Sequence, residues 1–294
     1  MLFISFCVLC FATSQVIFVA DAAKIFGMYQ PSTQMNGFAN SGLWNSPEEA
    51  IAARTMPGST FTMNALNLQQ WASPWGTFVY PTPYALNPNY QQIFNAAALT
   101  LQALQANGSI AILFLGDELR CHGMPTPNIS AYATAAKQSC PACLVYYNEC
   151  SGTFSKSKYS DYRVPSTLDM ISVDYYPGQN DLNHQWVTQT VVPFYRQYII
   201  PKLPDHTKFM FVPQASGWTN QVPDKTDQSF EWSAKMMEDF AVACQSEGRC
   251  AGAMPWYWLP YPVSPSCPKC NQGCSTSTVC ISGAQAAGHA LLNS

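Results

Sequence analysis

The chain alternates short apolar runs with segments of helical character, and this alternation limits the folds that it can adopt. Eight strand-like runs begin at Lys24, Ser59, Gly76, Ser109, Leu144, Met170, Lys208 and Ala251. Several of them are continuously apolar, as is typical of parallel strands that are covered on both faces. Eight such strands in about 270 residues favour a single α/β domain, a closed (β/α)8 (TIM) barrel, over an open doubly wound sheet.

Helical patterns lie between most of these runs, at residues 46–56, 87–108, 128–138, 183–203, 226–248 and 283–293. The first of them starts with Ser46 as a cap residue and Pro47 in the first turn. Pro193 lies inside the fourth and predicts a kink or a division into two helices. Residues 260–281 follow the eighth strand and contain four cysteines, so we expect a disulfide-rich loop there.

The first 22 residues have the character of a secretory signal peptide. They are almost entirely apolar, and the segment "ADA" at its end fits cleavage after Ala22. A membrane anchor is the alternative, although the segment lacks charged flanks. Cleavage would leave residues 23–294 as one catalytic barrel domain, with no membrane segment. Sequons for N-glycosylation at Asn107 and Asn128 agree with export, so we expect a secreted protein, extracellular or lysosomal/vacuolar.

Cysteine usage also indicates an oxidising compartment. Removal of the first 22 residues leaves ten cysteines, an even number that suits a disulfide framework. Cys121 and Cys150 follow neighbouring strands and are expected to pair, as are Cys244 and Cys250 around a short turn. The four cysteines between Cys267 and Cys280 would then pair among themselves, which leaves Cys140 with Cys143. A zinc knuckle at residues 267–274 is the alternative reading of that segment.

The charge content excludes some partners and cofactors. Charged residues make up 11% of the chain and the net charge is -3, so no basic face is available for nucleic acid. There is no G-x-G-x-x-G after the first strand and no Walker motif, and the four histidines are scattered. We therefore expect a monomer without a cofactor or a metal ion.

Polar and aromatic residues gather where the predicted strands end. The run "ILFLGDELRC" ends its apolar part on two adjacent acids, Asp117 and Glu118. In a (β/α)8 barrel the active site lies at the carboxyl ends of the strands. Acids beside aromatic rings are typical of glycoside hydrolysis. The residues expected to bind substrate are Tyr29, Tyr80, Glu149, Asp174, Tyr175, Gln214, Trp256 and Trp258.

The segment "LGDEL", Leu115–Leu119, resembles the fourth-strand motif of barrel β-N-acetylhexosaminidases. The resemblance implies that Glu118 is the general acid/base. It also implies that Asp117 holds the 2-acetamido group of the substrate, whose carbonyl oxygen attacks the anomeric carbon, above Trp256 as the floor of the pocket. The expected activity is then substrate-assisted cleavage of glycans that contain N-acetylhexosamine.

Two alternatives remain open at this stage. One is a glycosidase with two catalytic carboxylates, Glu118 together with Glu149 or Asp174; the seventh strand, where many retaining barrel enzymes place their nucleophile, ends in Gln214. The other is a non-catalytic sugar-binding barrel. In either glycosidase reading, adjacent strand residues point to opposite faces, so both acids reach one cleft only if the backbone leaves strand geometry after Gly116.

Overall fold

The structure is a computed structural model. It describes residues 24–29, 31–71, 79–80, 84–156, 159–160, 162–176, 185–214, 216–217, 226–256 and 272–294. The expected signal peptide and Trp258 lie outside these ranges. None of the described helices is both long and apolar enough to cross a bilayer.

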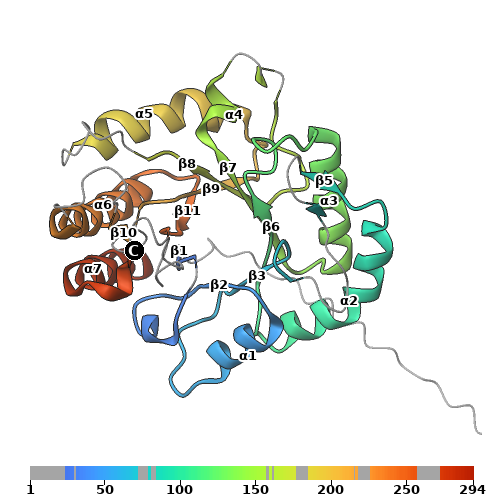
Figure 1. Cartoon of the computed structure of the whole chain (residues 1–294), viewed down its shortest axis with the longest axis horizontal. Coiled ribbons are helices and arrows are strands. Elements are labelled where there is room, and N and C mark those ends of the chain that lie inside the picture. The colour runs from blue at the N-terminus through green and yellow to red at the C-terminus, as the bar shows by residue number, and fades with distance from the viewer. Residues whose placement is uncertain are drawn as a thin grey trace, which may run out of the picture.

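The centre of the fold is an eight-stranded sheet in which every neighbouring pair of strands is parallel. Its strands, in spatial order, are β1 (Ile25–Phe26), β11 (Cys250–Ala253), β9 (Lys208–Phe211), β8 (Met170–Asp174), β7 (Leu144–Cys150), β6 (Ile112–Asp117), β3 (Ala65–Asn67) and β2 (Leu43–Trp44). A parallel bridge between Tyr29 and Leu43 joins the two end strands, β1 and β2. Strand order and direction are those of the predicted (β/α)8 barrel, with "ILFLGD" as its fourth strand (Figure 1).

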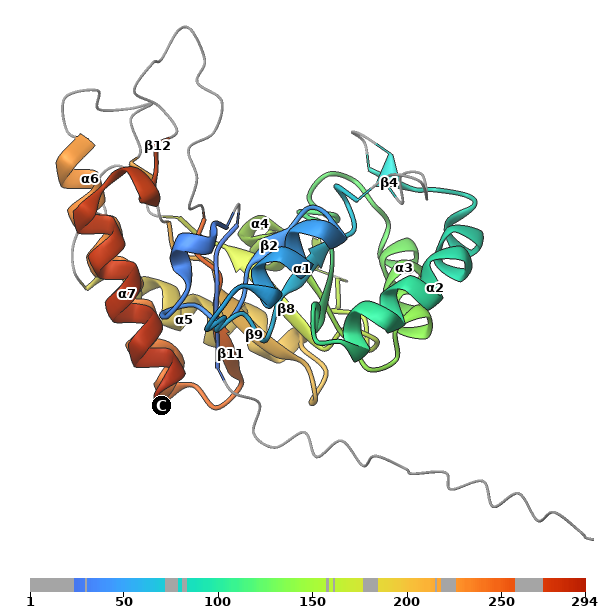
Figure 2. The same ribbon diagram turned by 90° about the horizontal axis from the view of Figure 1, so that it is seen from below.

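Helices surround the strands on the outside (Figure 1). They are α1 (Pro47–Thr55), α2 (Tyr90–Ala106), α3 (Thr126–Ser139), α4 (Ser151–Ser155), α5 (Val192–Phe194), α6 (Thr226–Ser246) and α7 (Thr278–Leu292). Ser46 caps α1 by accepting a hydrogen bond from the backbone N–H of Glu49, as expected. Helices α6 and α7 pack against each other along one side of the molecule (Figure 2).

Pro193 neither ends nor sharply divides its helical segment. It lies in α5, and π-helical turns stand on both sides, at Val187–Val191 and Tyr195–Ile199. The wider turns accommodate a residue that has no N–H and whose ring would clash with the preceding turn. The expected irregularity is present, but as a change of helix type.

The predicted second and third strands are corrected by the structure. The second barrel strand is Leu43–Trp44, which is too short to carry a periodic signal, and the run from Ser59 becomes extended only at β3. The run from Gly76 contributes β4 (Val79–Tyr80), which pairs antiparallel with β5 (Ala85–Leu86) outside the barrel. Val79 and Tyr80 thus belong to a two-stranded local pairing and not to the eight-stranded sheet. Tyr80 is therefore not at the end of a barrel strand.

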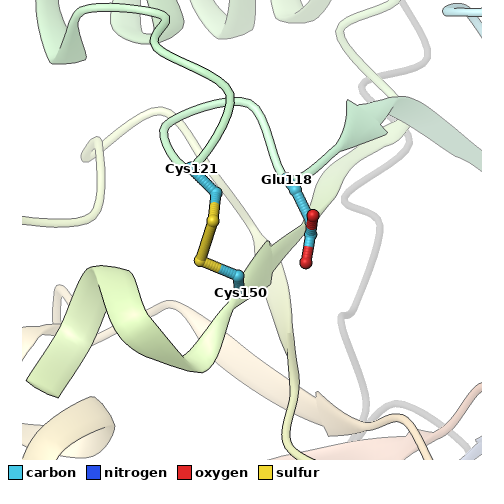
Figure 3. Close-up of side chains that lie close together, drawn as sticks. All are labelled: Glu118, Cys121 and Cys150. Atoms are coloured by element: carbon cyan, nitrogen blue, oxygen red, sulfur yellow. A yellow bond between two sulfur atoms is a disulfide. The ribbon is translucent and has the colours of Figure 1, made fainter.

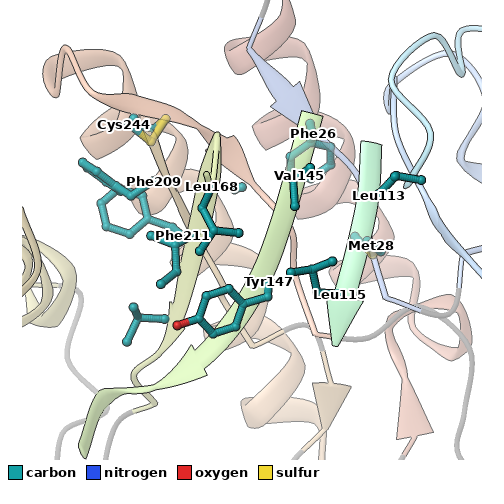
Figure 4. Packing of buried hydrophobic residues seen from close by; sticks show 14 of the residues in the cluster. Phe26, Met28, Leu113, Leu115, Val145, Tyr147, Leu168, Phe209, Phe211 and Cys244 are labelled. Carbon is teal, nitrogen blue, oxygen red and sulfur yellow. A yellow bond between two sulfur atoms is a disulfide. The ribbon is translucent and has the colours of Figure 1, made fainter. Parts of the chain in front are cut away.

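The buried apolar residues form two clusters, one on each face of the sheet. The larger lies between strands and helices and includes Leu113, Leu115, Val145 and Tyr147 (Figure 4). The smaller fills the barrel interior and includes Ile112, Phe114, Tyr146 and Met170. Alternate residues of one strand thus supply opposite faces, which explains why the strands are continuously apolar. Gly252 allows β1 to approach β11, because a Cβ there would overlap the carbonyl oxygen of Ile25.

Four disulfides confirm most of the predicted pairing. They are Cys121–Cys150, Cys140–Cys143, Cys244–Cys250 and Cys274–Cys280. Cys267 and Cys270 lie outside the described residues, so their pairing stays a prediction.

Candidate active site

A β-bulge in β6 directs Asp117 toward the barrel interior. Phe114 lies opposite Tyr146, and the next paired residues are Asp117 and Asn148, so β6 advances three residues while β7 advances two. Without the bulge, the alternation that places Phe114 inside would place residue 116 inside and Asp117 outside. Gly116 occupies the bulge with φ of 152°, where an added Cβ would lie 2.9 Å from Leu119. The bulge needs glycine and is the reason that an acid, rather than its neighbour, faces inward.

Glu118 leaves strand geometry directly after Asp117. Its φ is 50°, and it is the one non-glycine residue with positive φ in the described part of the chain. The left-handed conformation costs about 1–2 kcal/mol for such a residue. The Glu118 N–H donates to the carbonyl of Asn148 at 2.9 Å, and the carboxylate lies 3.0 Å from Nε2 of His122. Both adjacent acids therefore reach the carboxyl end of the barrel, through a turn at the position where one is required.

Asn148, the residue of β7 beside Asp117, connects the acids to the barrel interior. Its amide Nδ2 donates to Asp117 Oδ1 at 2.7 Å, and it also hydrogen-bonds Asp174 at the end of β8. Its Oδ1 accepts from the Ser172 hydroxyl at 2.5 Å. Because Oδ1 accepts from Ser172 and Nδ2 donates to Asp117, the orientation of the amide is fixed.

The same network continues inward through two buried tyrosines. Ser172 has a single proton and donates it to Asn148, so the Tyr146 hydroxyl, 2.6 Å away, donates to Ser172. The Tyr29 hydroxyl, 3.1 Å from that of Tyr146, then donates to it in turn. Every member of this chain has one allowed hydrogen-bond direction, and the chain ends on the two acids.

Burial makes ionisation of these acids unfavourable. It raises the pKa of Asp117 to about 6, although the hydrogen bond from Asn148 acts in the opposite direction. Burial, followed by the charge of Asp117, raises the pKa of Asp174 well above its usual range, and the Tyr176 hydroxyl donates to Asp174 at 3.1 Å. Since the charge on one acid disfavours the charge on the other, the pair retains a proton at mildly acidic pH.

A cavity of about 340 Å³ opens beside Asp117. Two of the predicted substrate-binding residues, Tyr29 and Trp256, line it, with ring centroids 4.6 Å apart. The remaining lining residues are Leu43, Asn45, Asn67, Gln69, Gln70, Tyr84 and Phe114. A concave site with aromatic rings, amides and one acid is suited to a polar, ring-shaped ligand.

The residues that line this cavity do not include Glu118, nor four of the predicted binding residues, Glu149, Asp174, Tyr175 and Gln214. Glu149 is fully buried on the outer side of β7, and its carboxylate accepts hydrogen bonds from the backbone N–H groups of Arg120, Cys121 and Cys150 and from the Thr153 hydroxyl. Tyr175 stacks on Phe194 and Trp186 beside the outer helices. Gln214 is buried and is bridged through its backbone to Trp256.

Glu118 also lies close to a disulfide. One ligand atom each of Glu118, Cys121 and Cys150 fall within 4.8 Å of one another, a grouping that could hold a metal if the thiols were free (Figure 3). The two sulfurs are bonded to each other, and a disulfide offers no thiolate to a metal. Its evident effect is to tie the loop after Glu118 to the end of β7.

The sequence reasoning missed the amide residues and Asn148. Asn67 ends β3 and residues 68–70 directly follow it, and their place at the carboxyl edge was hidden because the strand was expected too early in the chain. Asn148 precedes Glu149, and only one of two adjacent strand residues faces inward. The signal that could have selected it is its spacing of two from Tyr146, an interior residue.

No family model matches the chain, and no curated protein matches it in sequence. Solved structures are similar to it in fold. A β-D-glucuronidase from Dictyoglomus thermophilum has a TM-score of 0.55 at 15% identity over 90% of this chain, which spans only 50% of that protein's length. A GH113 β-mannanase from Alicyclobacillus acidocaldarius has a TM-score of 0.53 at 15% identity, over 92% of this chain and 99% of that one.

A thermostable mutant of a xylanase from Cellvibrio japonicus has a TM-score of 0.53 at 11% identity, over 92% of this chain and 98% of that one. At such identities the similarity establishes the TIM-barrel fold. Fold alone does not assign a function, which has to be argued from the site.

Proposed function

We propose that this protein is a secreted glycoside hydrolase in which Glu118 is the general acid/base. The observation that carries the proposal is the gathering of three carboxyl groups, Asp117, Glu118 and Asp174, at the carboxyl edge of the barrel. The cavity that borders this cluster is lined by aromatic rings and amides. That all three structural neighbours described above are named as glycosidases supports the same activity.

In the substrate-assisted mechanism, Glu118 protonates the glycosidic oxygen as the bond to the anomeric carbon breaks. Asp117 accepts a hydrogen bond from the N–H of the 2-acetamido group, and the carbonyl oxygen of that group attacks the anomeric carbon. Glu118, now ionised, takes a proton from the water that opens the cyclic intermediate. Trp256 supplies an aromatic face for the sugar ring, and the substrates are glycans that contain N-acetylhexosamine.

One observation favours a second mechanism. Asn148 donates a hydrogen bond to Asp117, and its side chain also lowers the pKa of Asp174, so both acids lie beside one amide. Asp174 could then serve as the second carboxylate of an ordinary two-acid glycosidase, with Glu118 as its partner. Glu149 is a poor candidate for this role, because its carboxylate is fully buried and accepts four hydrogen bonds from its own surroundings.

The test is an activity screen on aryl glycosides of N-acetylglucosamine, N-acetylgalactosamine and glucose. Glu118→Gln is expected to lower kcat by about 10²–10⁴-fold, the usual contribution of general acid–base catalysis. Asp117→Asn and Asp174→Asn are compared with Asp205→Asn, a matched change of an exposed acid in the turn before β9, at the opposite end of the barrel.

The outcomes distinguish the substrate-assisted mechanism, the two-acid mechanism and a non-catalytic barrel. Turnover of N-acetyl sugars only, lost in Asp117→Asn, supports substrate assistance. Equal turnover of glucosides, lost in Asp174→Asn, supports the two-acid mechanism. Sugar binding without any turnover supports a non-catalytic barrel, and wild-type rates in Glu118→Gln refute its role as the acid.

A further inference from the structure

Four amide side chains form one wall of the cavity. We call the set of Asn45, Asn67, Gln69 and Gln70 the amide wall. These residues lie at the end of β3 or directly after β2 and β3, so they stand on the opposite side of Asp117 from Asn148 and Asp174. Nothing in the mechanism proposed above uses them.

Backbone contacts determine which amide atoms remain for a ligand. The Gln69 N–H donates to Asn67 Oδ1 at 3.2 Å, so Asn67 must use its NH2 group to donate to Asn45 Oδ1, 3.0 Å away. That leaves the NH2 group of Asn45 as its remaining side-chain donor.

Gln69 is fixed in the same way. Its Oε1 accepts from the backbone N–H of Asp117 at 2.9 Å, which leaves its NH2 group. Gln70 makes no side-chain hydrogen bond with any residue that the structure describes, and its side chain is exposed. The amide wall thus offers two oriented NH2 donors and one adaptable amide, beside a carboxylate that accepts.

The charge of the lining points to the ligand class. Asp117 is the one ionisable acid among the described residues that line the cavity, and Lys, Arg and His are absent from that lining. The His122 ring lies tilted against the Tyr84 ring, with centroids 4.8 Å apart, but its imidazole is paired with Glu118. An anionic sugar would therefore lose water around its carboxylate, meet no cation among the described lining residues, and be repelled by Asp117.

We propose that the amide wall is a subsite that selects neutral, hydroxyl-rich pyranosides and rejects uronic acids. Hydroxyl oxygens accept from Asn45 and Gln69, Gln70 donates or accepts as needed, and the ring packs on Trp256. The inference deepens the proposed function, and rests on it for the assumption that the cavity holds a sugar. It sets the chain apart from its structural neighbour named as a glucuronidase.

The experiment measures binding without turnover. Methyl glycosides are compared in matched pairs, glucose with glucuronic acid, galactose with galacturonic acid and mannose with mannuronic acid, by NMR titration of the Glu118→Gln protein at pH 7. At least one neutral member is expected to bind about tenfold more tightly than its uronic partner. The reason is that the carboxylate of the uronic partner would be buried without a cation beside it. Equal affinity within every pair, or no binding by any neutral member, overturns the proposal.

A substitution at Gln70 tests whether a cation in the amide wall restores the binding of uronic acids. Gln70→Arg places a guanidinium in the wall and is expected to raise the affinity for the uronic partner by about tenfold. Gln138→Arg, in the exposed last turn of α3, adds the same charge outside the cavity and should change neither affinity. Unchanged uronide affinity in Gln70→Arg overturns the subsite. Selective binding of neutral sugars without hydrolysis by the wild type would leave the subsite standing and refute the glycosidase.

Discussion

Glu149 provides a quantitative test of how this edge of the barrel is built. Its fully buried carboxylate holds the turn after Glu118 by accepting from the N–H groups of Arg120 at 2.8 Å and Cys121 at 3.1 Å. Burial nevertheless raises the pKa of Glu149 from 4.5 to about 7, and the hydrogen bonds oppose that rise only in part. The folded protein therefore binds a proton here more tightly than the unfolded chain does.

The sign and size of the effect follow from linkage. Between pH 4.5 and about 7 the folded state holds more protons at this site than the unfolded state, so the free energy of unfolding falls as the pH rises. At 1.36 kcal/mol per pKa unit the loss is about 3 kcal/mol, complete above pH 7. Glu149→Gln cannot ionise and removes this slope. It also turns an NH2 group toward a backbone donor, which costs about 1–3 kcal/mol at every pH.

The assay is urea unfolding of the wild type and Glu149→Gln at pH 4.5, 5.5, 6.5 and 7.5, with the disulfides intact. Over this range, the free energy of unfolding of the wild type is expected to fall by about 3 kcal/mol relative to that of Glu149→Gln. Asp205→Asn, which changes an exposed acid, should track the wild type. A wild-type–Glu149→Gln difference that stays constant with pH would refute the reasoning, because it would mean that Glu149 does not titrate with a raised pKa.

Two further predictions concern the acids and the bulge. If Asp117 must be ionised to hold the substrate, kcat/KM falls as the pH drops through about 6. Asn148→Ala is expected to move this fall to higher pH, because the lost hydrogen bond had lowered the pKa of Asp117. A pH–rate profile that does not move contradicts the role of Asn148. Gly116→Ala should lower the free energy of unfolding by about 1–3 kcal/mol in urea melts, since its φ is 152° and its Cβ would press on Leu119, whereas Gly248→Ala, with open space around the added methyl, should not.

The sequence predicted those parts of the fold that rest on local pattern. The long apolar runs that became β6, β7 and β8 were placed correctly because a strand buried on both faces must be apolar throughout. The disulfide between Cys121 and Cys150 followed from strand order alone. β2 could not be found, because two residues carry no period and the strand is defined by its neighbours.

The candidate site was predictable in its location but not in its members. Parallel strand ends meet at one edge, so acids and aromatic rings there had to converge. Which of two adjacent residues faces inward depends on register, and the bulge at Gly116 shifts that register by one residue. On β7, which has no bulge at this point, sequence alone proposed Glu149 for the site, whereas the structure directs Asn148 inward and Glu149 outward.

Asn148 and Glu149 together also explain how a left-handed glutamate can persist at the end of β6. Glu118 is held by the hydrogen bond from its N–H to the backbone carbonyl of Asn148, and the turn after it is held by Glu149, which accepts from the N–H groups of Arg120 and Cys121. The Cys121–Cys150 bond closes the same loop covalently. Two buried acids with raised pKa values, Asp117 and Glu149, therefore weaken the folded state near neutral pH on either side of one strained residue. Backbone strain at Glu118 and two buried acids beside it all lower the stability of the fold. Such a concentration is expected where the position of a side chain, here that of Glu118, serves chemistry rather than stability.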